Sequence, residues 1–178
     1  EGCKTNMVTI DKGESVTENK ITYQIYQDGH AVVTGCDKEN TAVTIPEMIQ
    51  SHQVTEIASN AFQNCVNLKQ MILPNSLKTI GSYAFENCSG LTGLTLPKSL
   101  EKTGYGIFKN CTSLKEVNFD KEATKLPDRL FSECSSLKVI TLPDNITYTG
   151  AKLLENCDAT LYCHADSETA ISLIDREI

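Results

Sequence analysis

The stretch that decides the fold is CVNLKQMILPNSLKTIGSYAFEN, which runs from Cys65 to Asn87. It is one unit of a 23-residue repeat, because the same kinds of residue recur at this spacing along the chain. Six positions recur in phase: Cys65, Cys88, Cys111, Cys134 and Cys157; Phe62, Phe85, Phe108 and Phe131, with Leu154; Ala61, Ala84, Ile107, Leu130 and Leu153; Leu68, Leu91, Leu114 and Leu137; Met71, Leu94, Val117 and Ile140; Leu73, Leu96, Phe119 and Leu142. A period of this length indicates a solenoid in which each repeat is one coil.

The pattern within one unit predicts a strand followed by a turn. Met71 and Leu73 alternate with Gln70 and Ile72, so a short strand directs the first pair inward and the second pair outward. Pro74 ends this strand because it lacks the N–H that a ladder requires. The following S-Y-A-F-E-N-C segment predicts one helical turn that presents Ala84, Phe85 and Cys88 inward.

One coil alone cannot bury its apolar side, whereas stacked coils can bury it between them. Parallel strands about 4.8 Å apart would form a continuous sheet, and the phenylalanines would form a stacked spine. Three departures concern local packing: Thr103 and Thr149 stand where Ile80 and Leu126 suit the pattern, and Leu126-Pro127 replaces the Ile-Gly step.

The two ends of the chain predict caps. Ile21 to Gln27 alternate as a strand, and Asp28-Gly29 predicts a two-residue hairpin turn before a second strand from His30. The first coil carries five extra residues within EMIQSHQ (47–53), and the last coil is about two residues shorter, which aligns Leu161 and Cys163 with Ile140 and Leu142. The stretch ADSETAISLIDREI (165–178) predicts an amphipathic helix capped by Asp166 or Ser167.

The repeat resembles a known family. The units LPNSLKTIGSYAFENC (73–88) and IPEMIQSHQVTEIASNAFQNC (45–65), with the lead-in YQIYQDGHAVVTGC (23–36), are similar to the BspA-type leucine-rich repeats of bacterial surface proteins. The resemblance implies an α/β repeat solenoid, a right-handed coil with a parallel sheet on the concave side and short helical turns on the convex side. The expected divisions are an N-terminal β-hairpin cap (1–40), the repeat array (41–163) and a C-terminal capping helix (164–178), together one structural domain.

Composition limits the possible functions. The 178 residues carry a net charge of −7, which disfavours nucleic acid and anionic membrane surfaces as partners. No stretch reaches the roughly 18–20 apolar residues of a membrane helix, so we expect no membrane insertion. No signal peptide is visible, so an exported chain would have lost it already.

The eight cysteines have several possible roles. The ladder could form disulfides, bind metal or remain as buried thiols; parallel side chains about 5 Å apart at Cβ and the lack of clustered C-x-x-C spacings favour buried thiols. Cys3 and Cys36 lie outside the ladder and could pair with each other. Gly2-Cys3 weakly resembles a lipoprotein junction, although Glu1 does not fit one.

Catalytic and metal-binding motifs are not found in the sequence. It lacks G-x-S-x-G, a phosphate-binding glycine loop and H-E-x-x-H, and the histidines are scattered beside turns. The resemblance implies no catalytic residues, so we expect no enzyme activity, no cofactor and no metal. Asn64, Asn87, Asn110 and Asn156 also repeat, and we expect them to bond local backbone at the convex turn.

The outward strand positions are the candidate ligand site. They are Ala42 and Thr44 followed by Gln70, Ile72, Gly93, Thr95, Glu116, Asn118, Val139 and Thr141, with Lys69, Lys115 and Lys138 at the edge. The resemblance implies a monomeric extracellular or cell-surface binding module that adheres to a host matrix or bacterial surface protein or glycan. Two alternatives remain: a solvated sheet without a ligand, and a structural spacer that displays other domains.

Overall fold

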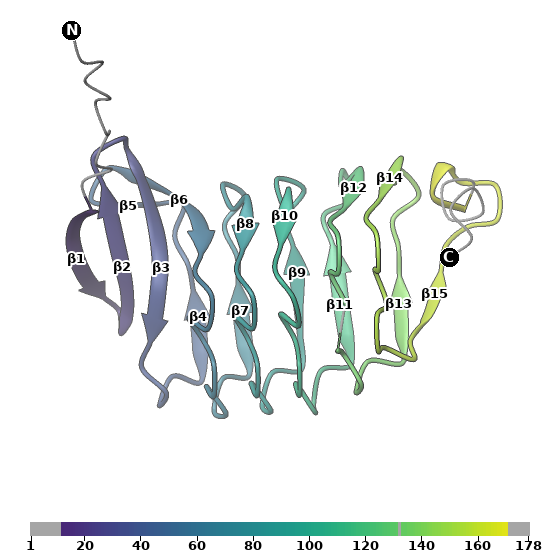
Figure 1. The fold of residues 1–178 in the computed structure, drawn as a ribbon, viewed down its shortest axis with the longest axis horizontal. Coiled ribbons are helices and arrows are strands. Elements are labelled where there is room, and N and C mark those ends of the chain that lie inside the picture. The colour runs from purple at the N-terminus through teal and green to yellow at the C-terminus, as the bar shows by residue number, and fades with distance from the viewer. Residues whose placement is uncertain (1–11, 132, 171–178) are drawn as a thin grey trace, which may run out of the picture.

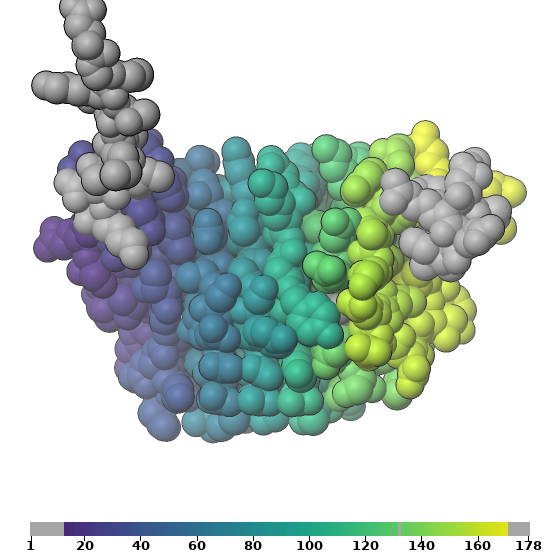
Figure 2. Space-filling model, in the orientation of Figure 1, coloured from purple at the N-terminus to yellow at the C-terminus, as the bar shows by residue number. Residues whose placement is uncertain are grey.

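The computed structural model describes residues 12–131 and 133–170 as a β-solenoid built of coils stacked along one axis (Figure 1). One strand series contains β4 (Ala42–Thr44), β7 (Gln70–Ile72), β9 (Gly93–Leu96), β11 (Glu116–Phe119), β13 (Val139–Thr141) and β15 (Thr160–Tyr162). The other contains β6 (His52–Ile57), β8 (Thr79–Ile80), β10 (Lys102–Thr103), β12 (Lys125–Leu126) and β14 (Tyr148–Thr149). The space-filling view shows the coils as successive bands of colour from one end to the other (Figure 2).

The first series forms parallel sheets in the register of the repeat. β11, β9, β7 and β4 pair in that order, and β13 pairs with β15. Asn118 lies beside Thr95, and Ile140 lies beside Leu161, which is the alignment predicted for the shortened last coil. Alternate residues point to opposite faces, so Met71, Leu94 and Val117 are buried while their neighbours in the strands are largely exposed.

The second series has a break that the sequence explains. β6, β8 and β10 belong to one sheet, whereas β12 pairs only with β14. Gly81 and Gly104 donate their backbone N–H to Ile57 O and Ile80 O of the preceding coils, both at 2.8 Å. Pro127 stands at the equivalent position without an N–H, so the ladder cannot continue there.

Glycine at this step is required by the approach of neighbouring coils. A Cβ built at Gly81 would lie 2.3 Å from the backbone nitrogen of Ser59, and one at Gly104 would lie 2.2 Å from that of Ser82. No side chain fits at these distances, so the recurrent Ile-Gly step sets how closely successive coils stack.

The predicted convex helical turns are wrong. The segments 60–64, 83–87, 106–110, 129–133 and 152–156, here named the turn segments, are tight turns that begin and end at a left-handed residue. In the second, Tyr83 and Asn87 have φ of 57° and 59°, which ends any helical path. Glu86 N bonds to Tyr83 O within the turn, while Phe85 N bonds to Ile107 O in the next coil at 2.9 Å.

The spacing of the coils explains why turns replace helices. An α-helix is about 10–12 Å wide, whereas strands stack about 4.8 Å apart. A turn whose alternate amides point along the axis is thin enough to stack at the strand spacing, and it satisfies those amides in the neighbouring coil.

The phenylalanines form the centre of the core. Phe62, Phe85, Phe108 and Phe131 are at most 1% exposed. The Phe62 and Phe85 rings are stacked with centroids 5.3 Å apart, and those of Phe85 and Phe108 are stacked at 5.6 Å. Phe131 packs edge-on against Phe119 of β11 at 6.1 Å, so this end of the spine also contacts the strand series.

The N-terminal end is a larger sheet than the predicted hairpin. β2 (Ile21–Tyr26) and β3 (His30–Cys36) are antiparallel as predicted, but the loop between them has three residues, 27–29, and Gly29 has φ of 92°. β1 (Lys12–Glu18), which the sequence did not predict, pairs with β2 across a two-residue turn at Asn19 and Lys20. β3 then pairs in parallel with β6, which joins this end to the coils.

The extra residues of the first coil form a small hairpin. β5 (Met48–Ile49) runs antiparallel to β6, and Gln50 and Ser51 make the two-residue turn with φ of 45° and 67°. The insertion therefore folds back on its own coil and leaves the register of the repeat unchanged.

The predicted capping helix is not supported. Residues 168–170 have helical conformation, and residues 171–178, where most of the prediction falls, lie outside the described residues. Ser167 does accept a hydrogen bond from Ala170 N at 3.1 Å through its hydroxyl, as a helix-capping residue would. Among the described residues no helix is long and apolar enough to cross a membrane.

Candidate interaction surface

The exposed side of the first strand series, here named the strand face, carries the predicted site residues side by side. All are exposed except Gly93, which is half-buried; they are Ala42, Thr44, Gln70, Ile72, Thr95, Glu116, Asn118, Val139 and Thr141. Ile72 is 62% exposed and Val139 48%. Apolar groups held open to water on a rigid sheet are the kind of surface that a partner can cover.

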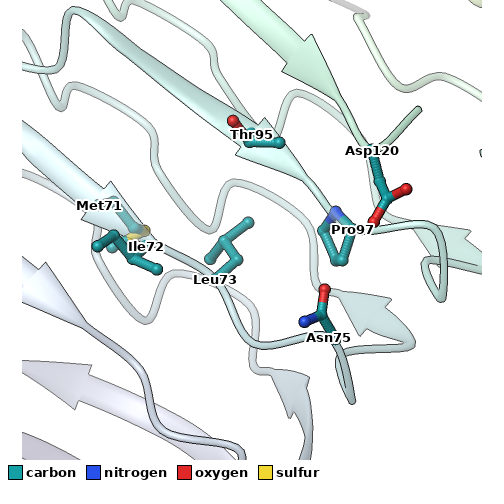
Figure 3. A pocket seen from close by; sticks show the side chains of 7 residues that line it. All are labelled: Met71, Ile72, Leu73, Asn75, Thr95, Pro97 and Asp120. Atoms are coloured by element: carbon teal, nitrogen blue, oxygen red, sulfur yellow. The ribbon is translucent and has the colours of Figure 1, made fainter. Parts of the chain in front are cut away.

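A shallow hollow lies at the end of β7 (Figure 3). It encloses about 140 Å³, and its lining includes Ile72 and Thr95, which were predicted, together with Asn75, Pro97 and Asp120, which were not. The last three follow the strands, where each coil turns away from the sheet. The prolines that end the strands, such as Pro97, were the sequence signal that could have located this side of the hollow.

A second and larger hollow lies between β11 and β13. It encloses about 470 Å³ and is lined by Lys115, Glu116, Val117, Asn118, Val139 and Thr141. Its lining combines one positive and one negative side chain with amide, hydroxyl and aliphatic groups. Such a surface can form both hydrogen bonds and apolar contacts with a ligand. Its lining contains no nucleophile paired with a general base.

Tyr162 is a further residue of the strand face that the sequence reading missed. It lies in β15 beside Thr141, is 55% exposed and lines a hollow with Thr141, Leu142, Cys163 and His164. Its outward position follows from the alignment of Leu161 with Ile140, so the alternation of the last strand already implied it.

The turn segments offer a different surface. Asn87 Nδ2 donates to Asn64 Oδ1 at 2.8 Å, Asn110 Nδ2 donates to Asn87 Oδ1 at 3.1 Å, and Asn156 Nδ2 donates to Glu133 Oε1 at 2.9 Å. The predicted local backbone bonds are therefore replaced by a side-chain ladder between coils. These groups already satisfy one another, which leaves fewer of them available to a ligand.

Charged and aromatic groups on the same side are also paired. Tyr83 and Tyr105 meet edge-on at 5.8 Å, and Lys109 Nζ lies 5.6 Å from the centre of the Tyr83 ring. The Tyr105 hydroxyl donates to Glu133 at 2.5 Å, which lowers the pKa of that carboxyl together with the Asn156 amide and Lys109.

The cysteine ladder lies in the interior. Cys65, Cys88, Cys111 and Cys134 are at most 2% exposed, and Cys157 is half-buried. Cys88 Sγ donates to Phe62 O at 3.1 Å and Cys111 Sγ to Phe85 O at 3.0 Å, so these thiols bond the coil before them. Burial raises the pKa of Cys88 to about 12, which keeps it a neutral thiol.

The potential metal ligands among residues 12–131 and 133–170 are dispersed. No group of three or more His, Cys, Asp and Glu side chains is placed to hold a metal ion there. His164 Nδ1 lies 2.7 Å from Asp144 Oδ1 and His30 contacts Asp28, but both pairs are at the exposed surface. Cys163 is adjacent to His164 in sequence, but the hydrogen-bond partner of the His164 ring is Asp144.

Comparison with known proteins identifies the same repeat. The family model for the BspA type Leucine rich repeat region matches residues 35–172 in six copies. A search of curated proteins finds no match. Among solved structures, the T. pallidum Leucine Rich Repeat protein is 27% identical with a TM-score of 0.69, over 83% of this chain and 71% of that one.

Two further structures share the fold. A leucine rich cell surface protein from Faecalibacterium prausnitzii is 23% identical over 89% of this chain and 53% of its own, with a TM-score of 0.57. The Pneumococcal vaccine antigen PcpA is 20% identical over 84% of this chain and 49% of its own, with a TM-score of 0.54. The chain thus spans about half the length of these two proteins. With six matched repeats across most of its length, the chain belongs to the BspA-type leucine-rich repeat family.

Proposed function

We propose that this chain is a cell-surface interaction module that binds a protein or glycan of a host matrix or another bacterium on its strand face. The observation that carries the proposal is the exposure of Ile72 and Val139 on a sheet otherwise lined by small and polar side chains. Most large aliphatic side chains of this chain are buried, so two that are exposed on the same face, one in β7 and one in β13, favour a surface that is covered when a partner binds.

The rigidity of the strand face supports binding. Its side chains project from backbone that is hydrogen-bonded to the neighbouring coil, so little conformational entropy is lost when they contact a ligand. The turn segments satisfy their polar groups internally, as the Asn87–Asn64 bond illustrates, which leaves the strand face as the more available surface.

The relatives support the location. One solved structure is described as a leucine rich cell surface protein and another as a vaccine antigen.

The width of the face limits the affinity. Six strands about 4.8 Å apart span about 24 Å. A face of this size would struggle to bury the roughly 800 Å² per partner of a standard interface. We expect micromolar binding by one copy, strengthened by avidity when many copies share a cell surface.

The test is a pair of matched lysine substitutions. Ile72→Lys and Val66→Lys each place a charge on a similarly exposed aliphatic position, 62% and 50% exposed respectively, but only Ile72 lies on the strand face. Binding of the purified variants to immobilised extracellular matrix proteins, to a glycan array and to whole bacterial cells is measured by surface plasmon resonance and adhesion counts. We expect at least a tenfold loss for Ile72→Lys and no loss for Val66→Lys.

Three outcomes decide between the readings. Loss on Ile72→Lys alone supports the strand face. Loss on Val66→Lys alone refutes it and assigns binding to another surface. Unmodified protein that binds none of the three probes favours the spacer, in which the coils only hold other parts of the protein apart.

A further inference from the structure

Two cysteines from different parts of the fold come together at the first coil. Cys36 is the last residue of β3, and Cys65 is the first member of the cysteine ladder. The parallel pairing of β4 with β7 places the segment that follows Cys36 beside the segment that follows Cys65, and the two cysteine side chains interact. Asn40 Nδ2 donates to Cys36 Sγ at 3.2 Å. Cys36 packs against the core and remains partly open to solvent, whereas Cys65 is 1% exposed.

Cys65 differs from the other thiols of the ladder in what precedes it. Cys88 and Cys111 each donate to a carbonyl oxygen of the turn segment one coil earlier. The element that precedes Cys65 is β3 with the loop after it, so the side chain that interacts with its thiol there is that of Cys36.

The loop of residues 37–41 is hydrogen-bonded to the residues that follow Cys65. Asn67 Nδ2 donates to Lys38 O at 3.3 Å, and Lys69 N donates to Thr41 O at 2.8 Å. These bonds keep the loop of residues 37–41 beside residues 67–69, and so they hold Cys36 close to Cys65 without a covalent link.

We propose that Cys36 and Cys65 form a thiol–disulfide exchange site, which a low-molecular-weight disulfide oxidises to an intramolecular bond fastening the N-terminal sheet to the first coil. The Cys36 thiolate attacks one sulfur of the small disulfide RSSR, forms a mixed disulfide and releases RS⁻. The Cys65 sulfur then attacks Cys36 Sγ and displaces the second RS⁻, which takes up the Cys65 proton. Two electrons pass from the protein sulfurs to RSSR, which leaves as RS⁻ and RSH.

The surrounding groups suit Cys36 to the attacking role. The interaction with Cys65 is the main cause that lowers the pKa of Cys36. Desolvation and Asp37 oppose this shift, and Asn40 and Lys20 add to it. Lys20 Nζ lies 3.7 Å from Asp37 Oδ2, so the two nearest charges largely offset each other. The same contact raises the pKa of Cys65, whose charge becomes easier to form once Cys36 is bound in a mixed disulfide.

The experiment uses tryptic mapping of the intact chain. The reduced protein is incubated with oxidised glutathione, alkylated, and digested without reduction. Cleavage after Lys20, Lys38 and Lys69 places Cys36 in the peptide 21–38 and Cys65 in the peptide 39–69, each with a single cysteine. We expect the two peptides to be found as one disulfide-linked species, with a Tm about 5–10 °C above that of the reduced protein.

Matched variants separate this bond from other thiol chemistry. Cys36→Ser should lose both the linked species and the rise in Tm, whereas Cys157→Ser, which alters the other end of the ladder, should keep both. A stable glutathione adduct on Cys36 would overturn the proposal, as would linkage of peptide 21–38 to the peptide that contains Cys3 or Cys88. If Cys36→Ser still yields peptide 39–69 in a disulfide-linked form, Cys65 pairs with another cysteine and the proposal is overturned.

Discussion

Thr149 and Thr103 occupy the same position in different coils and differ in one hydrogen bond. Thr149 is 0% exposed, and its hydroxyl is a buried side-chain oxygen for which the described residues supply no hydrogen-bond partner. The Thr103 hydroxyl donates to Asp128 O at 2.8 Å, across the gap in the ladder that Pro127 leaves. Replacing each by valine keeps the shape of the side chain and removes the hydroxyl.

The two substitutions should change stability in opposite directions. A buried polar group without a partner costs about 1–3 kcal/mol, so Thr149→Val should raise the free energy of unfolding by about 1–2 kcal/mol. Thr103→Val loses a bond worth about 0.5–1.5 kcal/mol and should lower it by that amount. For a chain of this length these values correspond to shifts in Tm of roughly 2–8 °C upward and 1–6 °C downward.

Urea and thermal unfolding followed by circular dichroism measure both variants against the unmodified chain. The double variant provides a control, because sites in separate hydrogen-bond networks should give additive changes. If Thr149→Val is destabilising to the same extent as Thr103→Val, the Thr149 hydroxyl has a partner and the reasoning is wrong.

Three further predictions concern the spine, the turn segments and the thiol pair. Phe108→Ala should cost about 3–5 kcal/mol in urea unfolding, because the ring is 1% exposed and stacked on Phe85; a loss under about 1 kcal/mol would mean that neighbouring coils collapse into the space. Lys152 has φ of 57°, so Lys152→Gly should stabilise the protein by about 0.5–1 kcal/mol, even after loss of the exposed ion pair with Glu155. Gly106 occupies the equivalent position with φ of 58°, so Gly106→Ala should destabilise the protein by about 1–2 kcal/mol. Changes of the same sign in thermal melts of the two variants would contradict this reasoning. Alkylation of Cys36 by iodoacetamide should rise with pH around a midpoint below that of an unperturbed thiol, since the thiolate reacts and its pKa is lowered. A midpoint at or above the value of an unperturbed thiol would contradict the interaction with Cys65.

The sequence predicted the coils well because their period recurs at several positions at once. Each of Leu94, Val117 and Ile140 is buried in a strand whose neighbours point outward. The alternation therefore also located the outward residues, although whether they bind a ligand stays a proposal.

The turn segments were mispredicted because their apolar spacing fits a helix equally well. Ala84, Phe85 and Cys88 lie one and three residues apart, as on one face of a helix, and only the left-handed residues at both ends exclude it. The repeated asparagines were a signal of left-handed backbone, but Tyr83, Arg129 and Lys152 adopt it without such a signal.

Contacts made by the non-repeating part could not be read from the sequence. β1 was missed because its turn, Asn19-Lys20, lacks the glycine that usually marks a hairpin. The meeting of Cys36 and Cys65 depends on how the loop of residues 37–41 returns to the first coil, and no periodicity constrains a loop that occurs once.

The direction of the inter-coil hydrogen bonds gives the solenoid a particular mechanical behaviour. Bonds such as Phe85 N to Ile107 O join one coil to the next and so lie along the stacking direction, in which the strands follow one another in Figure 1. Tension between the two ends therefore opens the bonds of one coil before those of the next, in contrast to a sheet loaded in shear, where many bonds resist together. Each coil that unwinds releases 23 residues, or about 75–80 Å of extended chain. A cell attached through such a protein would be held by a tether that lengthens stepwise under flow and shortens again as its coils restack.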